Sequence, residues 1–180
     1  DSVTDDGEVT TALASVQPCP IGITENYGNK INEMSMLISG NSDSEIVQRP
    51  LLMVVAAALV DGDGRVLVQQ RPPGKPMAGL WEFPGGKVDP GELPEAALCR
   101  ELEEELGIGV ESACLAPATF ASESLGERHL LLLLYALRKW SGVPQAKHAT
   151  ALKWVRPLEL HRLDMPPADK PLTGLLEALI

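Results

Sequence analysis

The amino-acid sequence predicts a mixed β-sheet with helices packed on it, a fold of the α/β or α+β class. Two apolar runs, residues 51–60 and 130–137, are typical of strands that are buried on both faces. Residues 94–106 are rich in good helix formers, begin with proline and are followed by Gly107, which predicts a helix. Because strands precede and follow this helix, and a second helix ends the chain, the helices can pack on a common sheet.

The first apolar run is followed by a turn and a returning strand. Residues 61–64, Asp-Gly-Asp-Gly, form a typical turn sequence, and residues 65–71 alternate as a strand, which predicts a β-hairpin with residues 51–60. The turn also resembles the start of a calcium loop. However, Pro72 occupies the position that requires an acidic ligand, so this function is excluded.

The remaining elements follow in order along the chain. Residues 72–79 are rich in proline and glycine and predict a loop, and residues 80–83 predict a short strand. Within the helix, Leu98, Leu102 and Leu106 recur every four residues, so we expect them to face the core. Residues 152–155 predict another short strand, and residues 171–180 predict an amphipathic helix.

The composition excludes several classes of protein. Of the 180 residues, 44% are hydrophobic and 22% are charged, so the chain can build a core and is not disordered throughout. The longest uncharged apolar run, residues 51–60, is too short to span a membrane. A formal net charge of −10 argues against binding to a nucleic-acid polymer, which requires a basic surface.

The acidic charge is concentrated in the first quarter of the chain. Residues 1–48 carry eight acidic residues and one lysine, a net charge of −7, whereas residues 49–180 carry 17 acidic and 14 basic residues, a net charge of −3. Residues 1–48 lack a sustained hydrophobic period, which predicts a flexible or weakly ordered acidic extension before a compact domain at 49–180. Three widely spaced cysteines and the lack of a visible secretory signal predict a cytoplasmic protein with reduced thiols.

Three glutamates of the predicted helix share one face. Glu101, Glu104 and Glu105 are spaced by three and four residues, and like charges at this spacing destabilise a helix. A divalent cation would offset the repulsion, and carboxylate ligands favour Mg²⁺, with Mn²⁺ also possible. Considered alone, the three glutamates fit a solvated acidic face better than a cation site.

The residues before the helix favour the cation site. Gly85 and Gly86 allow the backbone to approach phosphates closely, and Lys87 supplies a compact positive charge. Arg100, next to the acidic face, can pair with Glu92 and hold the loop against the helix. These residues together predict a site for a phosphorylated ligand.

The same residues carry a resemblance to a known family. The pattern G-x5-E-x7-R-E-U-x-E-E-x-G-U, in which U is apolar, is the Nudix box, and residues 86–108 match it at every defined position. The chain therefore resembles the Nudix hydrolases. This resemblance implies an α/β/α sandwich with a mixed β-sheet, in which a loop-helix-loop binds Mg²⁺ and a nucleoside diphosphate linked to another group is hydrolysed.

Further stretches resemble the MutT-like subgroup, the 8-oxo-dGTP diphosphatases. Residues 80–87, 128–129, 139–142 and 165–169 extend the likeness over residues 50–180. The resemblance implies that Glu101, Glu104 and Glu105 hold the metal and act in catalysis. It also implies that Glu92 and Arg100 support these three glutamates, and that the substrate is bound by Arg71, Phe83, Gly86, Lys87, Arg128 and Asp169.

Two positions depart from the MutT pattern. Asp169 stands where the best-known MutT has asparagine, and a carboxyl in place of an amide leaves the preference for purines open. His148 stands where several relatives have a glutamate that serves the water at the metal, and it fits either a base or a surface histidine.

The predicted function is a Mg²⁺-dependent nucleoside triphosphate pyrophosphohydrolase that converts 8-oxo-dGTP to 8-oxo-dGMP and pyrophosphate. Either Glu101 or Glu105 is the expected base. One alternative is a Nudix pyrophosphohydrolase of pyrimidine triphosphates such as CTP or 5-methyl-dCTP, and another is a nucleotide-binding Nudix module without catalysis. We expect a monomer or weak dimer whose partner is the nucleotide, with neither a nucleic-acid polymer nor a membrane as a partner.

Overall fold

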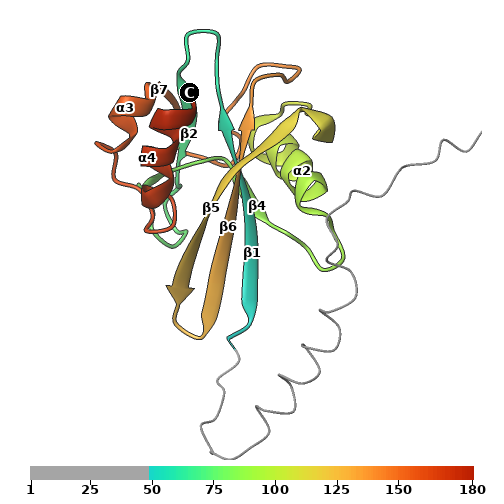
Figure 1. Cartoon of the computed structure of the whole chain (residues 1–180), viewed down its shortest axis with the longest axis vertical. Helices are drawn as coiled ribbons and strands as arrows, with labels where there is room; N and C mark the ends of the chain where they lie inside the picture. Colours follow the sequence, from blue (N-terminus) through green and yellow to red (C-terminus); the bar gives the residue numbers. More distant parts are fainter. Residues whose placement is uncertain (1–48) are drawn as a thin grey trace, which may run out of the picture. The chain divides into compact units, whose positions relative to one another are not determined.

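The computed structural model describes residues 49–180, and the prediction for residues 1–48 lies outside them. The described strands form two sheets (Figure 1). The larger sheet has the order β4-β1-β6-β5, and β1 and β6 run parallel while the other neighbours run antiparallel, so it is mixed as predicted. Its strands are β1 (Leu51–Leu59), β4 (Gly85–Lys87), β5 (Leu115–Leu125) and β6 (Arg128–Leu137).

The smaller sheet is antiparallel and has the order β3-β2-β7. Its strands are β2 (Val66–Gln70), β3 (Trp81–Glu82) and β7 (Ala151–Val155). The predicted hairpin between residues 51–60 and 65–71 is therefore wrong, because β1 and β2 lie in different sheets. β4 and β6 already occupy both edges of β1, so β2 pairs with β3 and β7 and retains only a single bridge, Val60 to Val66.

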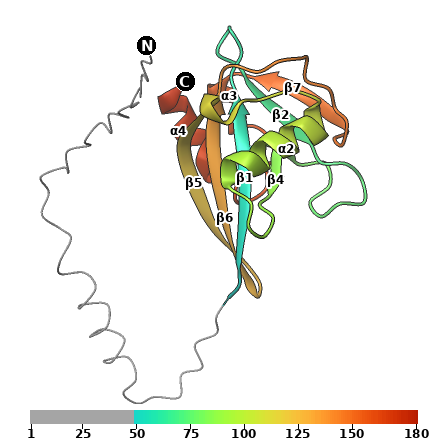
Figure 2. The same cartoon turned by 90° about the vertical axis from the view of Figure 1, so that its right-hand side faces the viewer.

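The helices lie on opposite faces of the larger sheet (Figures 1 and 2). Helix α2 (Pro94–Leu106) covers one face, and α3 (Pro157–Leu160) and α4 (Lys170–Leu179) lie on the other side. This arrangement confirms the predicted α/β/α sandwich. A short 3₁₀ helix, η1 (Ser112–Cys114), precedes β5.

Two hydrophobic cores lie on the two faces of β1. Alternate residues of a strand point to opposite faces, so Ala56 and Ala58 pack into the core shared with α4, and Val55 and Ala57 into the core shared with α2. The prediction of a strand buried on both faces is confirmed. The α2 core also contains the three predicted leucines, each fully buried: Leu98, Leu102 and Leu106. No helix within residues 49–180 is long and apolar enough to cross a membrane.

Strand β5 is an element that the sequence pattern does not predict. It is an edge strand of the larger sheet, its burial does not alternate, and its register with β6 shifts between Pro117 and Thr119. Because only Leu115 and Ala121 of its eleven residues are buried, the strand has little hydrophobic signal of its own. It is stabilised mainly by backbone pairing with β6.

Candidate active site

The ends of helix α2 fix where its glutamates lie. Pro94 occupies the first turn, where a missing backbone N–H is tolerated, and Gly107 ends the helix in the left-handed region with φ 70°. The N–H of Gly107 donates to the carbonyl of Glu103 at 3.0 Å. Because the leucine side of the helix is buried against the sheet, the side chains of Glu101 and Glu105 are directed to the neighbouring strand β4 and a cavity beside it.

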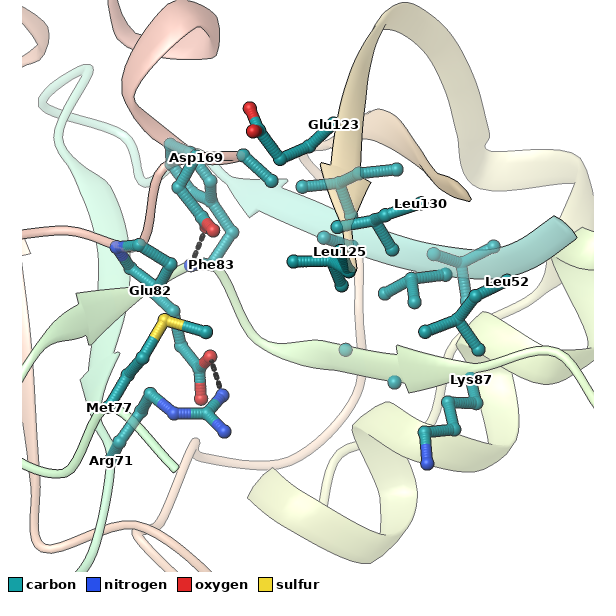
Figure 3. A pocket seen from close by; sticks show the side chains of 18 of the residues that line it. Leu52, Arg71, Met77, Glu82, Phe83, Lys87, Glu123, Leu125, Leu130 and Asp169 are labelled. Carbon is teal, nitrogen blue, oxygen red and sulfur yellow. Dashed lines mark hydrogen bonds and ion pairs between the residues drawn. The ribbon is translucent and has the colours of Figure 1, made fainter. Parts of the chain in front are cut away.

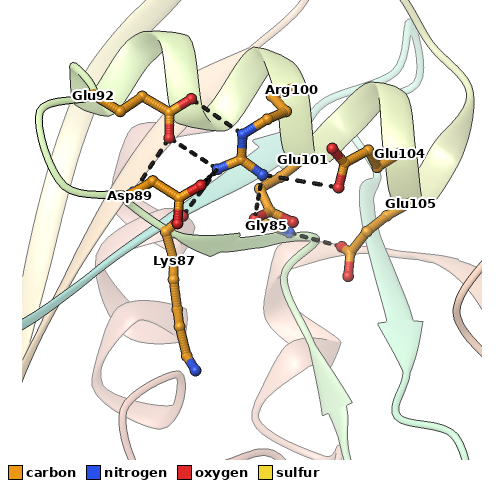
Figure 4. Close-up of polar contacts among 8 residues, drawn as sticks. All are labelled: Gly85, Lys87, Asp89, Glu92, Arg100, Glu101, Glu104 and Glu105. Carbon is orange, nitrogen blue, oxygen red and sulfur yellow. Dashed lines mark hydrogen bonds and ion pairs between the residues drawn. The ribbon is translucent and has the colours of Figure 1, made fainter.

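Arg100 is the centre of a polar cluster that joins the loop to the helix (Figure 4). Its Nε and Nη2 donate to the two carboxylate oxygens of Glu92 at 3.1 and 2.9 Å, so the pairing predicted from spacing is confirmed. Its Nη1 donates to Oε1 of Glu101 at 2.8 Å, and its Nη2 also donates to the carbonyl of Lys87 at 3.1 Å. The hydrogen bonds from Arg100 hold the pKa of Glu92 below its usual value.

Two glycines allow β4 to approach its neighbours. A Cβ on Gly86 would overlap the carboxylate of Glu101, and a Cβ on Gly85 would lie 2.7 Å from Cα of Ala56 in β1. Gly85 also has φ 150°, a backbone conformation that side chains disfavour. Gly86 therefore allows the backbone of β4 to lie directly beneath the carboxylate of Glu101, and Gly85 allows it to lie close to β1.

Glu105 is held through one of its two oxygens. Its Oε2 accepts hydrogen bonds from Nε2 of Gln69 at 2.7 Å and from the N–H of Gly85 at 3.1 Å. Burial raises the pKa of Glu105 above its usual value, although both hydrogen bonds favour the ionised form. Among the hydrogen bonds of residues 49–180, none reaches Oε1 of Glu105, which leaves that oxygen available to a ligand.

Gln69 is a residue of the site that the sequence gives no reason to select. Its side chain is 3% exposed on β2, and its Oε1 is the one buried side-chain oxygen or nitrogen within residues 49–180 that has no partner. A buried polar atom left unpaired costs about 1–3 kcal/mol. The contact with Glu105 joins residues 36 positions apart in the chain, so no local motif indicates it.

Arg71, directly after β2, and Glu82 of β3 form an ion pair at one wall of the cavity (Figure 3). The Nε of Arg71 donates to the carbonyl of Pro76 at 2.8 Å, which ties the loop 72–79 to the strand. Burial raises the pKa of Glu82, and Arg71 opposes this effect. The sequence predicts Arg71 as a site residue, but it gives no reason to select Glu82.

A cavity of about 680 Å³ lies beside these residues. Figure 3 places Asp169 and Lys87 on opposite sides of it. Asp169 is 6% exposed, and its carboxylate accepts a hydrogen bond from the N–H of Phe83 at 3.1 Å. Burial raises the pKa of Asp169 to about 7. The cavity brings together seven of the predicted site residues: Arg71, Phe83, Gly86, Lys87, Glu101, Glu105 and Asp169.

The other predicted residues do not line this cavity. Arg100 and Glu92 lie behind Glu101 in the polar cluster. The side chain of Glu104 is 52% exposed, with Oε2 3.8 Å from Nη1 of Arg100. Arg128 is exposed at the start of β6, where it pairs with Leu125 across the β5–β6 hairpin. His148 is exposed in the loop before β7.

The acidic residues of α2 have the chemistry of a site for a hard divalent cation. Their ligand atoms are all carboxylate oxygens, and Oε1 of Glu105 and the side chain of Glu104 are open. Within the described part of the chain, no three acidic, histidine or cysteine side chains are gathered closely enough to enclose a metal ion. Carboxylate oxygens of this kind fit Mg²⁺, which proteins hold through a few carboxylates together with phosphates and water.

Comparison with known proteins identifies the family. The NUDIX domain model matches residues 50–176. The chain is 38% identical over 128 residues to the CTP pyrophosphohydrolase of Escherichia coli K12, which covers 71% of this chain and 93% of that protein. It is 44% identical over 119 residues to the putative 8-oxo-dGTP diphosphatase 2 of Mycobacterium tuberculosis, which covers 66% of this chain and 82% of that protein.

Solved structures agree with these sequence relatives. The solution structure of the E. coli ORF135 protein has a TM-score of 0.65 and 37% identity, and the match covers 72% of this chain and 91% of that chain. The crystal structure of MutT NUDIX hydrolase from Burkholderia pseudomallei has a TM-score of 0.59 and 32% identity, with 72% and 98% covered. The chain therefore belongs to the Nudix hydrolase family and to its MutT-like branch.

Proposed function

We propose that this Nudix hydrolase, which acts on phosphoric anhydride bonds, is a Mg²⁺-dependent pyrophosphohydrolase of nucleoside triphosphates, with 8-oxo-dGTP as its preferred substrate. The observation that carries the proposal is the cavity, because it joins Glu101 and Glu105 of the Nudix box to the buried carboxyl of Asp169. A cavity that has carboxylates able to bind a metal ion at one end and a buried polar group at the other suits a ligand that carries both a triphosphate and a base.

Glu101, Glu104 and Glu105 would hold the Mg²⁺, which Mn²⁺ can replace. When bound, the cation would neutralise phosphate charge and make an attacking water more acidic. Arg100 keeps Glu101 in place through its 2.8 Å hydrogen bond and is itself anchored on Glu92. Lys87, exposed at the rim of the cavity, supplies a positive charge for a phosphate.

Hydrolysis requires a group that removes a proton from water. Glu101 and Glu105 are the two carboxylates of helix α2 that line the cavity, so either one can act as this base. The water attacks a phosphorus atom, the bond to the bridging oxygen breaks, and the products are a nucleoside monophosphate and pyrophosphate. Positioning and charge stabilisation supply most of the acceleration in such a reaction.

Asp169 and Phe83 are the proposed contacts of the base. With a pKa of about 7, Asp169 can donate a hydrogen bond when protonated and accept one when ionised. An 8-oxoguanine base presents both N–H donors and carbonyl acceptors, so it suits a carboxyl of this kind. The relationship to the putative 8-oxo-dGTP diphosphatase 2 of M. tuberculosis supports this substrate.

A pyrimidine triphosphate is the second candidate. The CTP pyrophosphohydrolase of E. coli is matched over 93% of its length. Cytosine also presents a donor and an acceptor on neighbouring atoms, which a carboxyl can meet.

Pyrophosphate release from a panel of nucleotides tests the proposal. We expect 8-oxo-dGTP to give a higher kcat/KM than dGTP, CTP and 5-methyl-dCTP in the presence of Mg²⁺, and a chelator to abolish the activity. A higher kcat/KM for CTP or 5-methyl-dCTP would replace the first substrate with the second candidate. Activity that survives complete removal of divalent cations would contradict the metal assignment.

A further inference from the structure

Gln69 has a place in the fold that packing does not explain. It is the fourth of the five residues of β2 and is only 3% exposed, and it follows the buried apolar residues Leu67 and Val68. One end of its carboxamide, Nε2, donates to Oε2 of Glu105 at 2.7 Å, while Oε1 has no partner within the described residues. A residue that served only the core would not leave a buried acceptor unpaired.

The register of the smaller sheet places Gln69 between two carboxylates. Gln69 of β2 is directly opposite Glu82 of β3 in an antiparallel pair, so their side chains lie on the same face. Glu105 approaches from α2, and the charge of Glu82 acts on it unfavourably. The carboxamide therefore donates to a glutamate whose other neighbours include a like charge.

We propose that Gln69 is a positioning residue of the reaction centre. It fixes Oε2 of Glu105, together with the N–H of Gly85, so that Oε1 of Glu105 faces the ligand. The role of Glu105 in this inference rests on the proposed function, whereas the contact between Gln69 and Glu105 is independent of it. Outer-shell hydrogen bonds of this kind orient metal ligands, and their loss typically lowers metal affinity or activity about 10- to 100-fold.

The test uses Gln69→Met in the full chain, with Gln70→Met as a matched control. Methionine keeps the length of the side chain and removes the donor. Gln70 is the next residue of β2, and its Nε2 donates to the carbonyl of Gly79 at 2.9 Å on the other face of the strand. The measurements are kcat and KM for pyrophosphate release, the Mn²⁺ dissociation constant of the substrate-free protein by electron paramagnetic resonance, and Tm.

For Gln69→Met we expect kcat to fall about 10-fold or more and Mn²⁺ to bind about 10-fold more weakly. KM should stay within about twofold. Tm should change little, because the loss of the hydrogen bond to Glu105 and the removal of an unpaired buried acceptor oppose each other. Gln70→Met should leave kcat and the Mn²⁺ dissociation constant within about twofold.

Two results would overturn the inference: an unchanged kcat and Mn²⁺ affinity in Gln69→Met, or a loss of both that follows a fall in Tm. If Gln69→Met does not fold, Gln69→Leu provides a second apolar replacement under the same measurements. If the unchanged protein releases no pyrophosphate from any nucleotide, the proposed function fails, and the Mn²⁺ comparison alone decides whether Gln69 positions Glu105.

Discussion

At the scale of single residues, two glutamates of the site are fixed by hydrogen bonds, and a third is exposed to solvent. Glu101 is held by Arg100 at 2.8 Å, and Glu105 is held by Gln69 and Gly85. Glu104, by contrast, is 52% exposed and lies 3.8 Å from the guanidinium of Arg100. An exposed ion pair of this length contributes little to folding, so any strong effect of Glu104 must act on the reaction.

Glu104→Gln should therefore lower turnover and leave stability unchanged. Removal of one carboxylate from the proposed cation site is expected to reduce kcat by at least about 100-fold, with Tm unaffected. Glu103→Gln is the matched control, because Glu103 is an exposed glutamate of the same helix and its kcat should stay within about twofold. Near-normal turnover of Glu104→Gln in a Mg²⁺-dependent assay would remove Glu104 from the cation site.

Asp169 should make the stability of the protein depend on pH. Its pKa is raised from 3.8 to about 7, chiefly by burial, with Glu82 raising it further and Arg71 lowering it. Between these two pH values the folded state keeps the proton that the unfolded state releases, so the stabilisation is complete below about pH 4 and is lost as the pH rises through 7.

Asp169→Asn removes this dependence while keeping an oxygen for the N–H of Phe83. We expect the Tm of the unchanged protein minus that of Asp169→Asn to decrease steadily from pH 4 to pH 7.5. Thermal unfolding of both proteins across this range provides the measurement, and titrating groups that do not interact with Asp169 cancel in the difference. A difference in Tm that is flat or rises with pH would contradict the raised pKa.

At the scale of elements, the sequence predicts the parts whose contacts are local. The helix 94–106, its buried leucines and the pairing of Arg100 with Glu92 all follow from spacing within about 15 residues, and the structure confirms them. The separation of β1 and β2 into two sheets does not follow, because it depends on β4 and β6 occupying the edges of β1. Strand β5 has no pattern of its own and forms through pairing with β6.

The same distinction applies to the site. The box residues on α2 and the loop before it are recognisable in the sequence because their spacing is fixed by a helix. Gln69 and Glu82 reach the site through the register of β2 with β3, and Arg128, which the sequence places among the ligands of the substrate, does not line the cavity. Contacts that depend on strand register and on the packing of distant elements leave no local signal.

Strand β4 lies so close to α2 that a single methyl group added at Gly86 is expected to disturb the site. In Gly86→Ala the new Cβ would overlap the carboxylate of Glu101, which is the flexible end of a side chain and can move. We expect the fold to survive and kcat to fall at least about 10-fold, since small displacements of a reacting group are costly. Measurements of kcat and Tm test this expectation.

Gly62→Ala is the matched control for this variant. Gly62 lies in the exposed turn after β1, and a Cβ there meets nothing within 4 Å. Its kcat should equal that of the unchanged protein. Equal losses of activity in Gly86→Ala and Gly62→Ala, or no loss in either, would show that the close approach of Gly86 to Glu101 is not required for the reaction.

At the scale of the whole molecule, the cavity draws on both layers of helices. Glu101 and Glu105 come from α2, which packs on one face of the larger sheet, and Asp169 directly precedes α4, which packs on the other. The relative positions of the proposed phosphate and base contacts are therefore set by two separate hydrophobic cores. Damage to either core is expected to alter the cavity even where no site residue changes.

The relatives indicate how much of the chain this architecture needs. The NUDIX domain model matches residues 50–176. The 8-oxo-dGTP diphosphatase of E. coli, 30% identical, is matched over 98% of its own length by 71% of this chain. Almost all of that relative is therefore matched by one part of this chain, and the other residues of this chain have no counterpart in it. We propose that residues 49–180 form an independent Nudix hydrolase domain.

A protein limited to residues 49–180 should accordingly fold and react as the full chain does. Because strands β1 to β7 and helices α2 to α4 are all retained, we expect kcat and KM within about twofold of the full-length values and an equal Tm. Loss of the acidic residues 1–48 also removes a net charge of −7, which can repel a negatively charged substrate. Because salt screens this repulsion, kcat, KM and Tm should be compared at two salt concentrations, so that an effect on substrate binding is distinguished from an effect on folding. A lower Tm that persists at both concentrations would mean that residues 1–48 stabilise the domain.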